Sequence, residues 1–116
     1  MGTSYVKFRD NGFWVQDRVL SDWLRSLIGE MRQSLAADHW LSSLISHWEI
    51  QREVHGGCMA LDLDRFLADE EKRRQVISAA ESALMHLEAS QLTGRLFLAL
   101  LKGEVKTNAS SPIDYL

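Results

Sequence analysis

Two apolar stripes of helical spacing, which do not line up with each other, constrain the fold of this chain more than any other feature. Large apolar side chains recur at intervals of one, three and four residues, first between residues 17 and 36 and again between 40 and 48. At about 100° per residue, the centre of the second stripe lies roughly a quarter turn from that of the first. The first stripe holds Val19, Leu20, Trp23, Leu24, Leu27, Ile28, Met31 and Leu35, and the second holds Trp40, Leu41, Leu44, Ile45 and Trp48.

This mismatch predicts a break near Ala37 rather than one continuous helix. Asp17 and Asp38 suit the N-cap position, where a carboxylate accepts a free backbone N–H. We therefore expect helices over about 17–36 and 38–54, joined by a very short connection and packed as an antiparallel pair on one core. One long bent helix is the alternative.

A β-hairpin is predicted before the first helix, over about 4–15. Strand-like residues occupy 5–8 and 13–15, and Asn11-Gly12 lies between them. Asn-Gly is a strong signal for a tight hairpin turn, because both residues adopt positive φ at low cost. We therefore expect the turn at residues 10–12. A two-stranded hairpin is only marginally stable alone, so its aromatic side chains should pack on the helices.

The second half of the chain predicts two more helices. Asp69 is a suitable cap for a helix over about 69–89, and Thr93 for a short one over about 93–102. Gly103 should end the last helix, because glycine commonly adopts the left-handed conformation that follows a helix.

The predicted fold is mainly α, close to the α+β class, with three or four antiparallel helices and a short N-terminal hairpin. Residues 61–68 fit a short helical turn or an ordered loop, and 104–116 an irregular tail. The length of 116 residues suits a single domain over 1–116 with its own core.

Composition excludes several classes of function. A net charge of −3 removes the general attraction to phosphates on which nucleic-acid binders rely, so we expect no nucleic-acid partner. The longest strongly apolar run, Leu96–Leu101, is too short to span a membrane. The single cysteine, Cys58, cannot form an internal disulfide, which favours a cytoplasmic location. Glycine-rich phosphate loops and serine-hydrolase elbows do not occur in the sequence, and we expect no cofactor.

One loop carries residue types that bind metals or attack substrates. His55 and Cys58 flank the only Gly-Gly pair, and Asp62 and Asp64 follow. A zinc ion would accept the imidazole and the thiolate, but it needs three or four protein ligands, which this spacing does not supply. The competing interpretation is that the glycines end a helix and Cys58 is a small buried residue.

The chain has four tryptophans, which is more than a protein of this length usually carries. Their large rigid side chains are typical both of binding surfaces and of cores. If they form a binding surface, we expect it at Trp14, Trp48 and the loop around Cys58, bordered by Asp62 and Asp64.

These observations favour a small cytosolic protein without enzymatic activity, an interaction module or inhibitor-like partner that acts through a preformed surface. Its partner would be another protein or a second copy of the chain. One alternative is a small metal-binding or thiol enzyme centred on His55, Cys58, Asp62 and Asp64. A further alternative is a homodimeric structural subunit, whose helices would pair through the small residues Ala79, Ala80 and Ala83.

Overall fold

The structure is a computed structural model of the chain that describes residues 2–34, 39–53, 59–86 and 91–104; for Ser34, His39 and Gln91 only the backbone is described. It confirms the mainly helical fold with an N-terminal hairpin. The elements are β1 (Thr3–Phe8), β2 (Asn11–Gln16), α1 (Asp17–Ser34), α2 (His39–Glu53), α3 (Leu63–Phe66), α4 (Glu70–Met85) and α5 (Gln91–Leu101).

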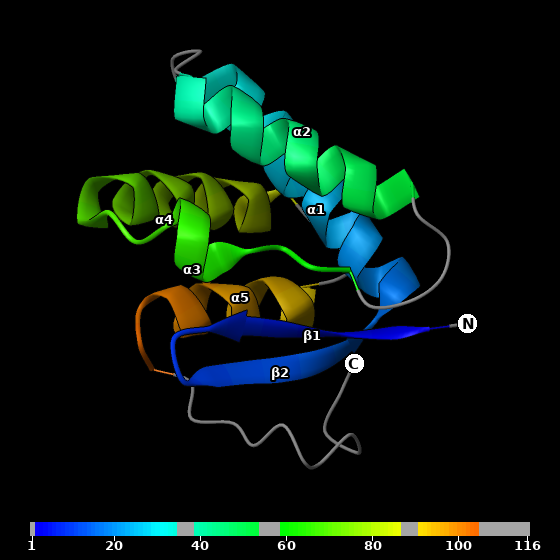
Figure 1. Cartoon of the computed structure of the whole chain (residues 1–116). Coiled ribbons are helices and arrows are strands. Elements are labelled where there is room, and N and C mark those ends of the chain that lie inside the picture. Colours follow the sequence, from blue (N-terminus) through cyan, green and yellow to red (C-terminus); the bar gives the residue numbers. More distant parts are fainter. Residues whose placement is uncertain (1, 35–38, 54–58, 87–90, 105–116) are drawn as a thin grey trace.

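The hairpin and the helices form stacked layers (Figure 1). The hairpin packs on α5, and α1 and α4 close the core on the other side of α5. Helix α2 runs antiparallel to α1, as expected, and lies on the outside of the molecule. None of the helices in the described part of the chain combines the length and the apolar character needed to cross a membrane.

Three aromatic side chains lie at the centre of the core. Trp23 of α1, Trp48 of α2 and Phe97 of α5 are completely buried. The ring of Phe97 meets both indoles edge-on, with ring centroids 5.7 Å from Trp23 and 6.2 Å from Trp48. Such edge-to-face contacts add to the free energy gained from burial alone. The core therefore joins three helices that are distant in the sequence.

The alanines of α4 also belong to this core. Ala79, Ala80 and Ala83 are at most 3% exposed, because α4 packs against α1 and α5. Small side chains allow this close approach, as expected. The suggestion that they pair two copies of the chain is wrong, since their surface is already covered within one copy.

The hairpin forms with a different turn from the one expected. Asn11 and Gly12 are paired residues of β2, opposite Phe8 and Lys7, and the chain turns at Arg9 and Asp10. Arg9 takes the left-handed conformation, with φ of 58°.

The packing of the hairpin explains this shift. The observed register places Phe13 opposite Val6, and both side chains are buried. A turn centred on Asn11-Gly12 would instead place Asp10 opposite Phe13 on the face that points to the core, where a carboxylate is costly to bury. Core packing thus overrides the local turn preference.

Two of the predicted helix ends, at Asp69 and Gly103, are confirmed, and the one at Thr93 is wrong. The Asp69 carboxylate accepts the Lys72 N–H at 3.0 Å and caps α4, as expected. Gly103, with φ of 78°, ends α5 in a Schellman motif: the N–H groups of Gly103 and Glu104 donate to the carbonyls of Leu100 and Ala99. Thr93 is not a cap, because α5 begins at Gln91 and Thr93 is buried within it.

Other predicted features lie outside the described residues. These are the break near Ala37, the Asp38 cap and the tail after residue 104. The helix expected to reach residue 89 ends earlier, at Met85, because His86 is its C-cap and donates its N–H to the Ala83 carbonyl.

Two glycine substitutions test the close packing inside the hairpin. A Cβ at Gly12 would lie 2.4 Å from the Val6 carbonyl oxygen and 2.6 Å from the Tyr5 ring. Because one of these atoms belongs to the backbone, we expect Gly12→Ala to lower the free energy of unfolding by about 1–3 kcal/mol. Gly29→Ala is the matched control: no atom lies within 4 Å of a Cβ in this helical position, so it should stabilise by about 0.5–1 kcal/mol. Urea denaturation measures both, and equal stability of the two variants would contradict the close contacts of Gly12 with Val6 and Tyr5.

Candidate interaction surface

Side chains of α2 bind the backbone of an extended segment of the same chain. The Ala60 N–H donates to Gln51 Oε1 at 2.9 Å, and the Ala60 carbonyl lies 2.7 Å from His47 Nε2. Since a carbonyl only accepts, His47 carries its proton on Nε2. Trp48 Nε1 donates to the Leu61 carbonyl at 3.0 Å. Consecutive turns of α2 thus hold residues 60 and 61 from one side.

Ser4 holds the same segment from the hairpin side. Its buried hydroxyl accepts the Met59 N–H at 2.7 Å and donates to the Asp17 carboxylate at 2.5 Å. The Asp17 N–H in turn donates to the Gly2 carbonyl at 3.0 Å. One hydroxyl therefore links β1, the first residue of α1 and the extended segment.

Asp62 and Asp64, both expected at a binding surface, make contacts within the fold. Asp62 adopts the left-handed conformation before α3, with φ of 53°, and its carboxylate lies 3.2 Å from His47 Nε2 and 3.8 Å from the Arg65 guanidinium. Asp64 Oδ1 accepts the Arg9 N–H at 2.6 Å, at the strained turn of the hairpin. Asp64 thus stabilises the backbone of the hairpin turn, whereas Asp62 contacts the side chains of His47 and Arg65.

The two tryptophans expected at the surface lie in different environments. Trp48 is completely buried and belongs to the core, so it presents no surface to a partner. Trp14 is partly buried on β2, where its ring packs against that of Tyr5 across the hairpin, with centroids 5.2 Å apart.

The predicted metal site has two of its four candidate ligands, Asp62 and Asp64, within the described residues. Within the described residues, no three His, Cys, Asp or Glu side chains are grouped so that they could hold a metal ion. His55 and Cys58 lie outside those residues. A site that includes them stays a prediction.

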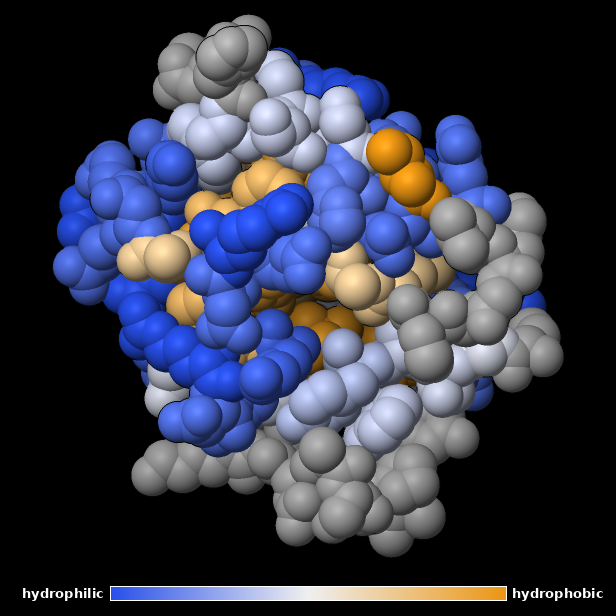
Figure 2. Space-filling view, viewed as in Figure 1, coloured by the Kyte–Doolittle hydropathy of each residue, from blue (hydrophilic) through white to orange (hydrophobic). Residues whose placement is uncertain are grey.

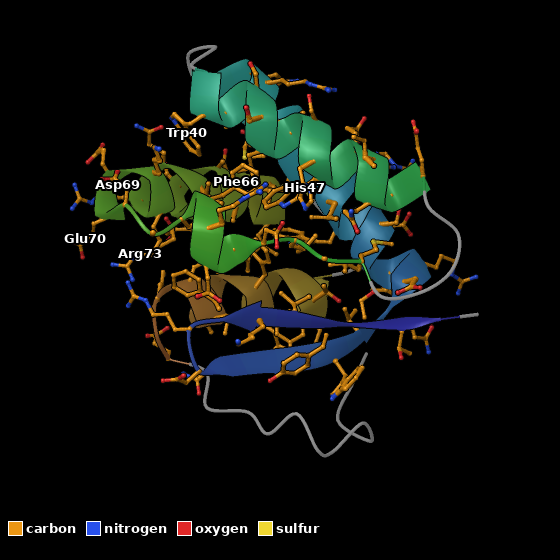
Figure 3. The ribbon with its side chains drawn as sticks, viewed as in Figure 1. Trp40, His47, Phe66, Asp69, Glu70 and Arg73 are labelled. Atoms are coloured by element: carbon orange, nitrogen blue, oxygen red, sulfur yellow. The ribbon has the colours of Figure 1, made fainter. Side chains whose placement is uncertain are left out.

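A cluster of aromatic side chains lies where α2 faces α3 and α4 (Figure 3). Trp40, His47 and Phe66 are each partly exposed, and the rings of His47 and Phe66 have centroids 5.6 Å apart. The Arg65 guanidinium lies 4.4 Å from the centre of the Phe66 ring, and the Lys72 ammonium lies 5.5 Å from that of Trp40. Such cation–π contacts restrain both the rings and the cations.

Next to this cluster, the outward side of α2 carries a shallow depression. It has a volume of about 480 Å³ and is lined by Ser42, Ser43, Ser46, His47 and Ile50. We call this surface the α2 face. The three serines are exposed, and Ile50 is 56% exposed. On this side the molecular surface is mostly hydrophilic, and hydrophobic side chains reach it at only a few places (Figure 2).

The first turns of α4, beside the cluster, are electrically balanced. Glu70 pairs with Arg73 at 2.8 Å, and Glu71 pairs with Arg74 at 3.0 Å. Arg73 also donates to the Leu101 carbonyl, which ties α4 to α5. This charged run is therefore a solvated surface with local ion pairs, and it offers no strong field to a ligand.

The serines and Ile50 of the α2 face were missed by the sequence analysis, although a signal exists. At 100° per residue, Ser42, Ser46 and Ile50 fall on the side of α2 opposite to the buried Leu44 and Trp48. An isoleucine among serines on the polar side of a helix is the anomaly that indicates this surface.

Comparison with known proteins identifies no relative: no family model fits the chain, and neither a curated protein nor a solved structure matches it. The surface of the molecule itself is then the basis for a functional proposal.

The Ser4 link can be tested by substitution. Ser4→Ala leaves the buried Met59 N–H without its acceptor, so we expect the free energy of unfolding to fall by about 1–3 kcal/mol. Ser78→Ala, at an exposed position of α4, should change stability by less than about 0.5 kcal/mol. Hydrogen exchange should also show faster exchange at Met59 and Ala60 in Ser4→Ala. Unchanged stability and exchange would exclude the proposed role of Ser4.

Proposed function

We propose that this chain is a small interaction module without enzymatic activity, a partner protein that binds another protein chain through the α2 face. The observation that carries the proposal is an apolar side chain, Ile50, exposed beside a depression on a helix whose opposite side is fully packed. Burial of exposed apolar area is the main favourable term in protein association.

The shape of the α2 face suits a protein partner. The depression is shallow and lies along one helix, whereas pockets for small molecules are usually concave and enclose most of the ligand. Short serine side chains allow a partner's backbone to approach α2 closely. Their hydroxyls both donate and accept hydrogen bonds, so they can satisfy polar groups of the partner.

The surface is also held in place before binding. His47, at its edge, is fixed by the Ala60 carbonyl, the Asp62 carboxylate and the Phe66 ring. Trp40 lies under the Lys72 ammonium. Side chains that are ordered in the free protein lose little conformational entropy on binding, which favours affinity.

We propose the cytosol as its compartment, because the single cysteine cannot form an internal disulfide. The metal or thiol enzyme centred on His55 and Cys58 stays the alternative. Metal analysis of the untagged wild-type protein and of the Cys58→Ser variant tests this alternative. A metal bound stoichiometrically to the wild type but absent from the variant would favour it.

Site-specific photo-crosslinking tests the α2 face. With a benzophenone amino acid at position 46, we expect adducts of discrete mass in cells that express the protein. The same probe at the exposed position 78 of α4 should not give them. Ile50→Glu should abolish the adducts, because a carboxylate opposes burial of this position. Met85→Glu, at another exposed apolar position that is 82% accessible, should leave them unchanged.

Both glutamate variants should keep a free energy of unfolding within about 0.5 kcal/mol of the wild type, because both positions are exposed. The proposal fails if position 46 gives no adduct, or if its adducts are also formed from position 78 or survive Ile50→Glu.

A further inference from the structure

The shape and charge of the α2 face point to one occupant. We infer that it binds the α2 face of a second copy of this chain, with the two helices antiparallel about a twofold axis that passes between Ser46 and His47. This inference rests on the proposed function and names the partner of the same surface.

The α2 face is complementary to itself in shape. An interface with twofold symmetry brings one surface against an identical one, so that surface must carry both a projection and the hollow that receives it. On α2 the exposed apolar side chain is Ile50, at one end of the depression, and Ser42, Ser43, Ser46 and His47 line the rest of it. An axis between residues 46 and 47 places Ser43 level with Ile50 of the second copy. Each isoleucine then enters the hollow of the other copy.

The charges at the two ends of α2 favour the antiparallel arrangement. Lys72 of α4 lies over Trp40, near the first turn of α2, and Glu53 is the last residue of α2. In the described part of the chain, neither of them forms an ion pair. Antiparallel pairing brings Glu53 of the second copy toward the end where Lys72 lies. Parallel pairing would bring like charges together and align the two helix dipoles unfavourably.

The contact is small, so the dimer should form reversibly. A helix of 15 residues is about 22 Å long, and a pair of such helices buries less area than a permanent interface. We therefore expect the weight-average mass in sedimentation equilibrium to rise from that of one chain toward that of two as the concentration rises from about 10 μM to about 1 mM.

Disulfide trapping distinguishes the arrangements. In a Cys58→Ser background, Ser46→Cys should cross-link two copies under mild oxidation, because position 46 lies beside the axis. Ser42→Cys is the matched control: in the antiparallel dimer the two copies of position 42 lie about 13 Å apart along the helices, beyond the reach of a disulfide. Cross-links at both positions would indicate a parallel dimer, and cross-links at neither would exclude pairing through α2. Either result overturns the inference.

Variants that change the α2 face complete the test. Ile50→Glu should keep the protein monomeric up to about 1 mM, whereas Met85→Glu should dimerise like the wild type. A wild-type protein that stays monomeric overturns the inference. For a protein that stays monomeric, the photo-crosslinking at position 46 decides whether the proposed function survives. Adducts with another protein that are lost in Ile50→Glu would keep the proposed function, and a lack of adducts would overturn both the proposed function and the dimer.

Discussion

A partly buried segment outside any helix or sheet must find other partners for its backbone, and this requirement organises the fold. Residues 59–62 run between α2 and the hairpin (Figure 1). Met59 and Leu61 are buried there, and Ala60 and Asp62 are exposed. A buried N–H or carbonyl left unpaired costs about 1–3 kcal/mol. Four side chains supply the partners: Ser4, His47, Trp48 and Gln51. The segment therefore fixes β1 and α2 relative to each other, although they scarcely touch.

The same contacts explain why polar residues occupy positions where a simple core would hold apolar ones. Ser4 faces inward on β1 opposite Val15, and its hydroxyl is satisfied by Asp17 and Met59. Trp48 serves two purposes, since its ring packs on Phe97 and its N–H holds the Leu61 carbonyl. Networks of this kind select one arrangement of the elements, because any shift leaves several buried polar groups unpaired at once.

Periodicity was sufficient to predict the helices, but not which of the two tryptophans of α2 lies at the centre of its buried side. Trp40 and Trp48 are eight residues apart, which is 80° of rotation at 100° per residue, so one lies at the edge of the buried side and the other at its centre. The hydrogen bond from Trp48 to the Leu61 carbonyl decides which tryptophan is central. The sequence does not predict this contact, because no pattern in it shows where residue 61 lies relative to α2. The hairpin turn was mispredicted for a similar reason: the pairing of Val6 with Phe13, together with Asp64, decides it against the local preference of Asn11-Gly12.

These internal contacts also determine how the outer surface of α2 can act. Hydrogen bonds from His47 and Trp48 to consecutive residues, 60 and 61, fix the rotation of α2 about its own axis. With the rotation fixed, Ile50 and the serines around it are held in one orientation toward solvent. The association proposed for this face then requires only that two ordered surfaces meet, without the entropy cost of ordering a helix on binding. A chain whose interior already fixes its exposed helix in this way suits a binding role that depends on a preformed surface.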